Sequence, residues 1–230
     1  MNHFSTDIKA DFPIFNSSDL IYLDNASTTQ KPSKVLEEID SFYKETNANV
    51  HRAIYSIGNE ATRRFESARE KVAKFINAPS SKEIVFTSGA TESINLLARS
   101  LVSNLEPGDE ILLSAMEHHS NIVPWQMMAE KFKVKIKYLP INKIGELDLN
   151  NSEQYFTSRT KIVSITHISN VLGTINPIED LAKMAHKVGA LFISDGAQGV
   201  PHMQVDVAKL GCDFYAFSGH KMLGPTGIGV

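Results

Sequence analysis

Short runs of β-branched and aromatic residues alternate with segments of helical periodicity from residue 80 onward. Such runs predict strands over residues 83–87, 110–114, 134–139, 161–166, 191–194 and 214–217. Between them, apolar residues recur at spacings of three and four, as from Ile94 to Val102 and from Ile178 to Val188, which predicts helices. This alternation favours an α/β fold, with a mostly parallel central sheet flanked by helices.

Two amphipathic segments, residues 33–46 and 59–76, precede this region and predict two further helices. We therefore expect an N-terminal arm with its helices over residues 1–79 and an α/β domain over residues 80–230. The chain ends at GIGV, inside a predicted strand, so we expect it to be the N-terminal portion of a longer protein.

The amino-acid composition indicates which classes of protein the chain can belong to. The chain is 42% hydrophobic and 21% charged with a net charge of −3, which is typical of a soluble globular protein without a basic surface for nucleic acid. It has no 18-residue apolar run and no secretory signal, so we expect no membrane span. The single cysteine, Cys212, excludes an internal disulfide and favours the cytoplasm.

Polar and titratable side chains recur directly after the predicted strands. Open α/β sheets bind ligands at the carboxyl ends of their strands, so clusters at several of these ends predict one ligand site. The clusters are SGATE at residues 88–92, EHH at 117–119, His167 with Ser169 and Asn170, Asp195 with Gln198, and Ser218 with His220 and Lys221.

Each cluster also has a purely structural interpretation. SGATE could cap a helix rather than bind phosphate, Asp195 could cap a turn, and Lys221 could be a surface lysine. The adjacent histidines lack the spacing of a zinc site, so we predict no metal. Taken together, a phosphate cradle, an acid for a pyridinium nitrogen, an aromatic ring and a desolvated amine that can condense with an aldehyde favour a pyridoxal phosphate site.

Several longer motifs then carry a resemblance to a known family. YLDNASTTQKPS, NVHRAIYS, EHHSNIVPWQ, THISNVLGT, DGAQ and FSGHKMLGPTGIG resemble the SUF-type (group II) branch of the cysteine desulfurase/selenocysteine lyase family, from about Asp11 to Val230. These are class V, fold-type I enzymes that depend on pyridoxal 5′-phosphate. The resemblance implies the large domain of that fold, with the small C-terminal domain outside this chain.

The resemblance also implies an activity and partners. It implies a homodimer that takes sulfur from L-cysteine, places it on an enzyme cysteine as a persulfide and leaves alanine. L-selenocysteine, which carries selenium in place of sulfur, is the alternative substrate. The sulfur then passes to an acceptor protein of iron–sulfur cluster assembly. The family's catalytic cysteine and its substrate-binding arginine fall outside this chain, so we expect the chain alone to be inactive. Cys212, ahead of a buried strand, is interpreted as a structural thiol.

Individual residues receive roles from the same resemblance. Lys221 corresponds to the Schiff-base lysine, His118 to the histidine stacked on the cofactor ring, and Asp195 to the partner of the pyridine nitrogen. Asn170 and Gln198 correspond to side chains around the ring oxygen, and Asn170 also to one at the substrate carboxylate. The phosphate cup corresponds to Ala90, Thr91, Ser218 and His220. His51 and Arg52 correspond to residues that reach the neighbouring subunit's site.

Two other interpretations stay open. One is another class V enzyme, such as a selenocysteine lyase, a kynureninase-like lyase or an aminotransferase, against which EHHSNIVPWQ and VHR argue. The other is a cofactor-binding piece without turnover.

Overall fold

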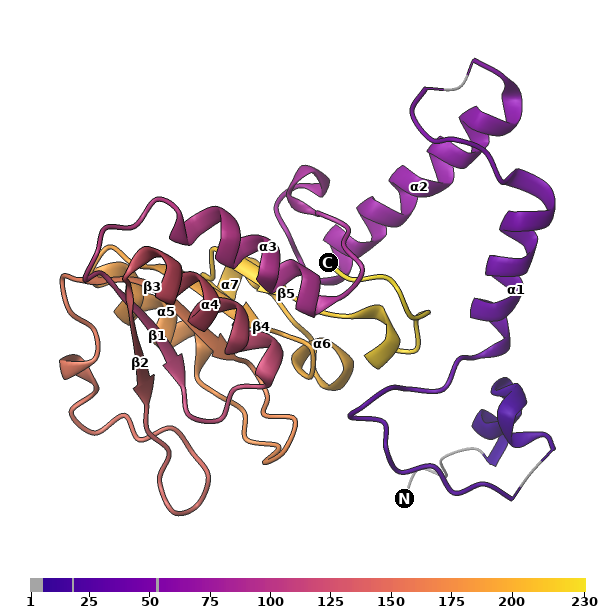
Figure 1. Cartoon of the computed structure of the whole chain (residues 1–230). Helices are drawn as coiled ribbons and strands as arrows, with labels where there is room; N and C mark the ends of the chain where they lie inside the picture. The colour runs from indigo at the N-terminus through magenta and orange to yellow at the C-terminus, as the bar shows by residue number, and fades with distance from the viewer. Residues whose placement is uncertain (1–5, 18, 53) are drawn as a thin grey trace.

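The strands of the sheet are all parallel, and helices separate most of them along the chain. The computed structural model describes residues 6–17, 19–52 and 54–230, and within these it contains one five-stranded sheet in the order β2-β1-β3-β4-β5 (Figure 1). The strands are β1 (Glu110–Ser114), β2 (Lys135–Leu139), β3 (Thr160–Thr166), β4 (Leu191–Asp195) and β5 (Phe214–Ala216). The prediction of a mostly parallel sheet flanked by helices is confirmed.

Helices fill most of the connections. They are α1 (Ser33–Ser41), α2 (Ser56–Phe75), α3 (Ala90–Val102), α4 (Val123–Phe132), α5 (Ile178–Lys187), α6 (Gly199–His202) and α7 (Val207–Leu210). Short 3₁₀ turns span Thr6–Asp11, Pro13–Phe15, Ser81–Glu83, His119–Asn121, Ser152–Gln154 and Gly219–Lys221, and a π-helical turn at Phe42–Thr46 extends α1. No helix of the described ranges is both long and apolar enough to cross a bilayer.

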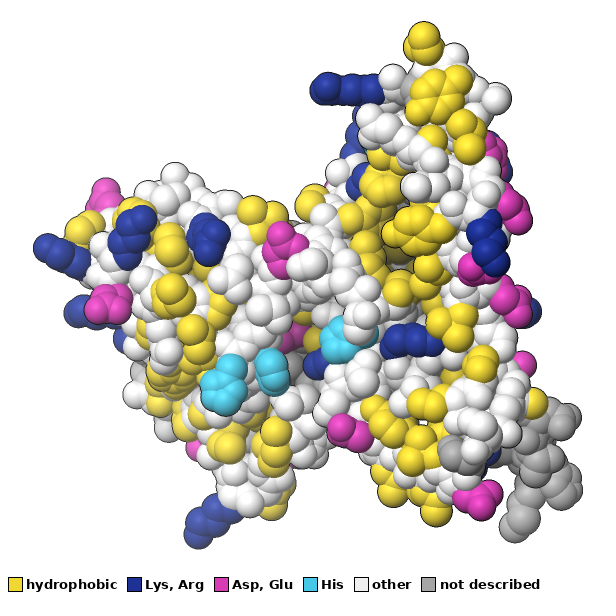
Figure 2. All heavy atoms as spheres, turned by 45° about the vertical axis from the view of Figure 1, so that its right-hand side comes forward, with side chains coloured by type: hydrophobic (Ala, Val, Ile, Leu, Met, Phe, Trp, Pro, Cys, Tyr) yellow, Lys and Arg dark blue, Asp and Glu magenta, His cyan; other side chains and the backbone are white. Residues whose placement is uncertain are grey.

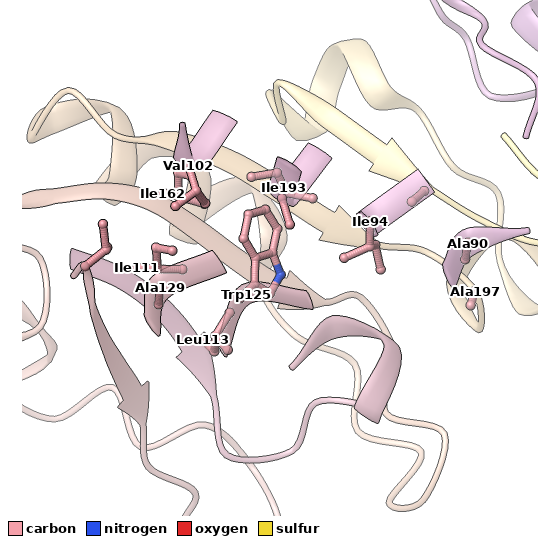
Figure 3. Close-up of a cluster of buried hydrophobic side chains, with 13 residues drawn as sticks. Ala90, Ile94, Val102, Ile111, Leu113, Trp125, Ala129, Ile162, Ile193 and Ala197 are labelled. Carbon is pink, nitrogen blue, oxygen red and sulfur yellow. The ribbon is translucent and has the colours of Figure 1, made fainter. Parts of the chain in front are cut away.

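Alternating side chains of the strands form the two halves of the core. Ile111 and Leu113 of β1 pack with α3 and α4 around Trp125, as Figure 3 shows, whereas Leu112 packs on the opposite face with α5. Because all three of these β1 side chains are fully buried, the strand reads as a continuous apolar run. Burial on both faces fixes the register of the strands and therefore where their carboxyl ends lie.

The end of the chain pairs antiparallel with the segment that follows β5. Phe217 and Val230 exchange backbone hydrogen bonds of 3.0 Å, and Gly229 pairs with Thr87 on its other side. A Cβ at Gly229 would overlap the backbone of Gly89, so only glycine allows this approach.

The predicted strand over residues 83–87 is wrong. Residues 81–83 form a 3₁₀ turn, and only Thr87 makes a bridge, to Gly229. The apolar side chains that suggested a strand serve another purpose here, because Ile84 and Phe86 pack with the end of α2 and with Val205 of the segment before α7.

The arm lies beside the sheet, and Arg69 is one of the residues that join it to the α/β domain. The helices predicted over residues 33–46 and 59–76 are present as α1 with its π-helical turn and as α2 (Figure 1). Arg69 of α2 lies over the rings of Phe65 and Phe86 at 5.0 and 4.9 Å and donates to the carbonyl of Ile84. This stacked guanidinium joins α2 to the segment that leads into α3.

Two residues of β4 differ in burial and should therefore differ in their contribution to stability. Ile193 is fully buried, whereas Leu191 on the same strand is 37% exposed. Ile193→Ala should lower the free energy of unfolding by about 2–5 kcal/mol, since it leaves a cavity against α3 and α4. Leu191→Ala should cost at most about 1 kcal/mol. Denaturant unfolding of the chain measures both, and equal losses would contradict this account of the core.

Candidate cofactor site

The nine residues that the resemblance assigns to the cofactor line one cavity of about 420 Å³. They come from the start of α3, from the end of β4 and from the segments after β1, β3, β4 and β5, and are Ala90, Thr91, His118, Asn170, Asp195, Gln198, Ser218, His220 and Lys221. The chain passes from β1 outward to β2 and returns to β3 on the other side of β1. The cavity therefore lies at the topological switch point, where open α/β sheets bind ligands.

Asp195 and Lys221 bring opposite charges into this cavity. Asp195 ends β4, is 3% exposed and accepts from the Ala197 N–H at 3.0 Å through one carboxylate oxygen. Burial raises its pKa, and Lys221 and His118 oppose the rise. Burial lowers the pKa of Lys221, against the pull of Asp195. Among the described residues neither charge has an ion-pair partner, so both remain available to a ligand.

His118 presents one ring nitrogen to the cavity because the other is engaged. Its Nδ1 accepts from the Ser120 N–H at 3.2 Å and lies 2.7 Å from the Ser120 hydroxyl. Nδ1 as an acceptor places the proton of the neutral ring on Nε2. Burial, and then the charge of Lys221, lower the pKa of His118, so the ring is neutral at pH 7.

An anion cup forms where α3 meets the turn after β5. The Ala90 N–H donates to Ser218 Oγ at 2.8 Å, so the Ser218 hydroxyl hydrogen is free to point at a ligand. The first turn of α3 adds the Thr91 hydroxyl and the positive end of the helix dipole. The Ala90 N–H, which the resemblance assigns to the phosphate, is therefore engaged by Ser218 Oγ in this structure.

The segment before α1 completes the wall, a feature that the sequence patterns did not predict. The carbonyl of His220 accepts from the Thr29 N–H at 2.9 Å, from the Thr29 hydroxyl at 3.0 Å and from Lys31 Nζ at 3.1 Å. The Thr29 hydroxyl also accepts from the Leu223 N–H at 2.8 Å. One threonine therefore holds the backbone on both sides of Lys221.

Residues next to the cavity lining hold the segment after β4 in place. Tyr215 Oη and His167 Nδ1 lie 2.8 Å apart, and a Cβ at Gly196 would overlap the Tyr215 ring. Gln198 donates to the Ala26 carbonyl at 2.7 Å, which ties the segment after β4 to the N-terminal wall. These contacts fix the backbone that carries Asp195.

The sequence matches the family described as Aminotransferase class-V over residues 21–230. The chain belongs to the class V aminotransferase family.

Relatives within this family share a further description. A probable cysteine desulfurase of Halalkalibacterium halodurans is 52% identical to the chain over 229 residues, which cover 97% of the chain and 56% of that protein. The apo structure of a cysteine desulfurase from Thermococcus onnurineus NA1 superposes with a TM-score of 0.92 at 42% identity, covering 97% of this chain and 55% of that one. The Escherichia coli cysteine desulfurase CsdA gives a TM-score of 0.87 at 42% identity, with 99% and 57% covered. The chain spans about half the length of these relatives.

His51, Arg52 and Cys212 lie outside the cavity lining, as do Glu117, His119, His167 and Ser169 of the predicted clusters. His51, with φ of 69°, pairs with Glu66 at 3.4 Å on the arm, and Arg52 beside it is exposed. Cys212 is half-buried ahead of β5, and burial raises the pKa of its thiol to about 11. A thiol of this kind is protonated at neutral pH and unreactive, in agreement with a structural role.

The electrostatics of the class V site predict a pattern of histidine pKa values. Burial lowers the pKa of both His118 and His220, and the charge of Lys221 lowers both further, whereas Lys31 acts on His220. Lys221→Met should therefore raise both pKa values, and Lys31→Met should raise that of His220 alone. NMR titration of the cofactor-free chain measures the pKa of each histidine. A His118 pKa that is the same in the wild type and in Lys221→Met would show that the Lys221 charge does not act on His118.

Proposed function

We propose that this chain forms the cofactor-binding part of a pyridoxal 5′-phosphate-dependent cysteine desulfurase. The observation that carries the proposal is the single cavity in which a buried carboxyl, a desolvated amine and an anion cup face the same space without pairing with one another. The names and similarity of the relatives support the choice of reaction.

The side chains of the cavity match the groups of the cofactor one by one. Ser218, Thr91 and His220 suit a phosphate, the Lys221 amine suits an aldehyde, and the Asp195 carboxyl suits a protonated pyridine nitrogen. The cavity of about 420 Å³ suits a small aromatic ring with its phosphate. When bound, the cofactor supplies an electron sink for the bond that breaks at the substrate Cα.

The protein's own groups prepare this chemistry. The lowered pKa of Lys221 leaves more of its amine unprotonated near neutral pH, which is the form that attacks an aldehyde. The raised pKa of Asp195 brings its basicity closer to that of a ring nitrogen, so the carboxylate can hold a proton there. His118, neutral and with Nε2 directed away from Ser120, can lie against the ring face and pass a proton.

For the complete protein we propose L-cysteine or L-selenocysteine as substrate and alanine as product. The sulfur goes to a cysteine other than Cys212, because its half-buried thiol with a pKa of about 11 is a poor nucleophile. An acceptor protein of iron–sulfur cluster assembly is the proposed destination.

We also propose a homodimer in which the arm reaches the second subunit. Figure 2 shows apolar side chains exposed along the arm. Tyr43 is 68% exposed and Ile54 is 100% exposed. Large exposed apolar patches mark protein interfaces. A dimer that covers this surface gives His51 and the exposed Arg52 a site to reach in the other subunit.

Asp195→Asn tests the proposal in the complete protein. The carboxylate matters most when negative charge develops on the ring, so alanine formation from L-cysteine should fall by roughly 10²–10³, as when an oxyanion-hole donor is removed. Alanine release over time, together with the unfolding midpoint, measures the effect.

Asp213→Asn is the matched control. Asp213 accepts from the Phe192 N–H at 2.7 Å but does not line the cofactor cavity, so its loss should affect stability and spare turnover. A fall of less than about threefold for Asp195→Asn would mean that Asp195 only caps the turn at Ala197.

A further inference from the structure

Glu117, the residue before His118 in the sequence, has a buried carboxyl that takes no part in the proposed chemistry. Glu117 is 8% exposed. One of its oxygens accepts from the Thr166 N–H at 2.9 Å and contacts the Ser114 hydroxyl. The other accepts from Asn121 Nδ2 at 2.7 Å. These contacts join the turn after β1 to the end of β3.

The orientation of the Asn121 amide is fixed by a group that can only donate. Trp125 Nε1 donates to Asn121 Oδ1 at 2.9 Å, and the fully buried Ser164 hydroxyl donates to the same oxygen at 2.6 Å. An indole nitrogen cannot accept a hydrogen bond, so Asn121 must turn its NH₂ toward Glu117. Residue 117 therefore faces an N–H donor with each of its two terminal atoms.

This requirement singles out a carboxyl. Glutamine has the same shape, but in either orientation it places its own NH₂ against the Thr166 N–H or the Asn121 NH₂. A buried donor without an acceptor costs the full desolvation of that group. The Glu117 carboxyl instead accepts both hydrogen bonds.

The network reaches His118 through the backbone. The carbonyl of His118 accepts from the Asn121 N–H at 2.8 Å, in the same turn in which Ser120 holds the ring nitrogen. On the other side, Thr166 lines the cavity and donates to the Ile168 carbonyl at 3.0 Å. Glu117 thus links the turn that carries His118 to the strand end that forms the cavity wall.

The charged groups near this turn are few. Asp195 of β4 faces Glu117, and Asp195, Lys221 and His119 face His118. Burial raises the pKa of Glu117 to about 8, so the carboxyl is largely neutral at pH 7. The Ser114 hydroxyl donates to the Glu117 oxygen that also accepts from the Thr166 N–H.

We propose that Glu117 is a positioning residue that holds His118 at the cavity wall through the hydrogen-bonded chain Trp125–Asn121–Glu117–Thr166. The proposal rests on the proposed function only for what His118 does there. The hydrogen bonds that hold His118 are present in the cofactor-free chain, so the positioning role of Glu117 can be tested without the cofactor.

Glu117→Gln is the first test, with the His118 ring as the reporter. In the cofactor-free chain, ¹⁵N NMR of labelled histidine reports the tautomer, and titration reports the pKa. In Glu117→Gln we expect loss of the predominance of the Nε2–H tautomer and a rise of the His118 pKa toward its ordinary value, because the turn opens to water. Glu110→Gln is the control, since Glu110 is a buried carboxyl at the far end of β1 that bonds Thr157 and Lys137. It should leave His118 unchanged.

The swap Glu117→Gln with Asn121→Asp is the second test, and it keeps the proposal falsifiable if the single variant does not fold. It exchanges carboxyl and amide without changing their size. The amide introduced at position 117 can accept from Thr166 and donate to the carboxylate at position 121, which still accepts from Trp125 and Ser164. We expect the double variant to recover the wild-type tautomer and pKa of His118.

Two results would overturn the proposal. One is a folded Glu117→Gln chain with a lowered unfolding midpoint and an unchanged His118, which would make Glu117 a structural residue only. The other is a folded double variant in which the His118 signals stay altered. A failure of the proposed function would show instead as absent cofactor binding and would leave these readouts unaffected.

Discussion

Two opposite charges share one cavity without touching, and the arrangement of the site depends on that separation. Burial raises the pKa of the Asp195 carboxyl and lowers the pKa of the Lys221 ammonium. The charge of each group partly offsets the pKa shift of the other. A direct ion pair would satisfy both groups and leave nothing for a ligand. The cavity of about 420 Å³ between the surrounding walls instead leaves both charges available to a molecule with complementary ends.

Keeping such charges apart requires a rigid backbone on each side. Asp195 ends a buried strand, and the glycine after it lies so close to the Tyr215 ring that no side chain fits there. Lys221 lies on a short turn whose flanking carbonyl and N–H are both bonded by Thr29. The site is thus built from segments far apart in sequence, and each holds its neighbour in place.

Much of this could be predicted from the sequence, because the information was local. The apolar runs of β1 to β5 indicated the strands, and the polar residues after them, such as Asp195 and Lys221, indicated the cavity. The apolar run at 83–87 misled, because its side chains pack on the arm rather than in a sheet. Contacts between distant segments left no periodic signal. Thr29 meets Leu223 across 194 positions, and the role of Glu117 depends on the direction in which Trp125 donates.

Lys221 is the amine through which we propose that this fold holds an aldehyde cofactor. The direct measurement is to incubate the chain with pyridoxal 5′-phosphate, reduce it with borohydride and locate the added mass by peptide mapping. The account predicts the label on Lys221, and none at that position in Asp195→Asn at low cofactor concentration, where binding is weakened. A label that is absent from Lys221, or spread equally over Lys31 and the surface lysines, would contradict it.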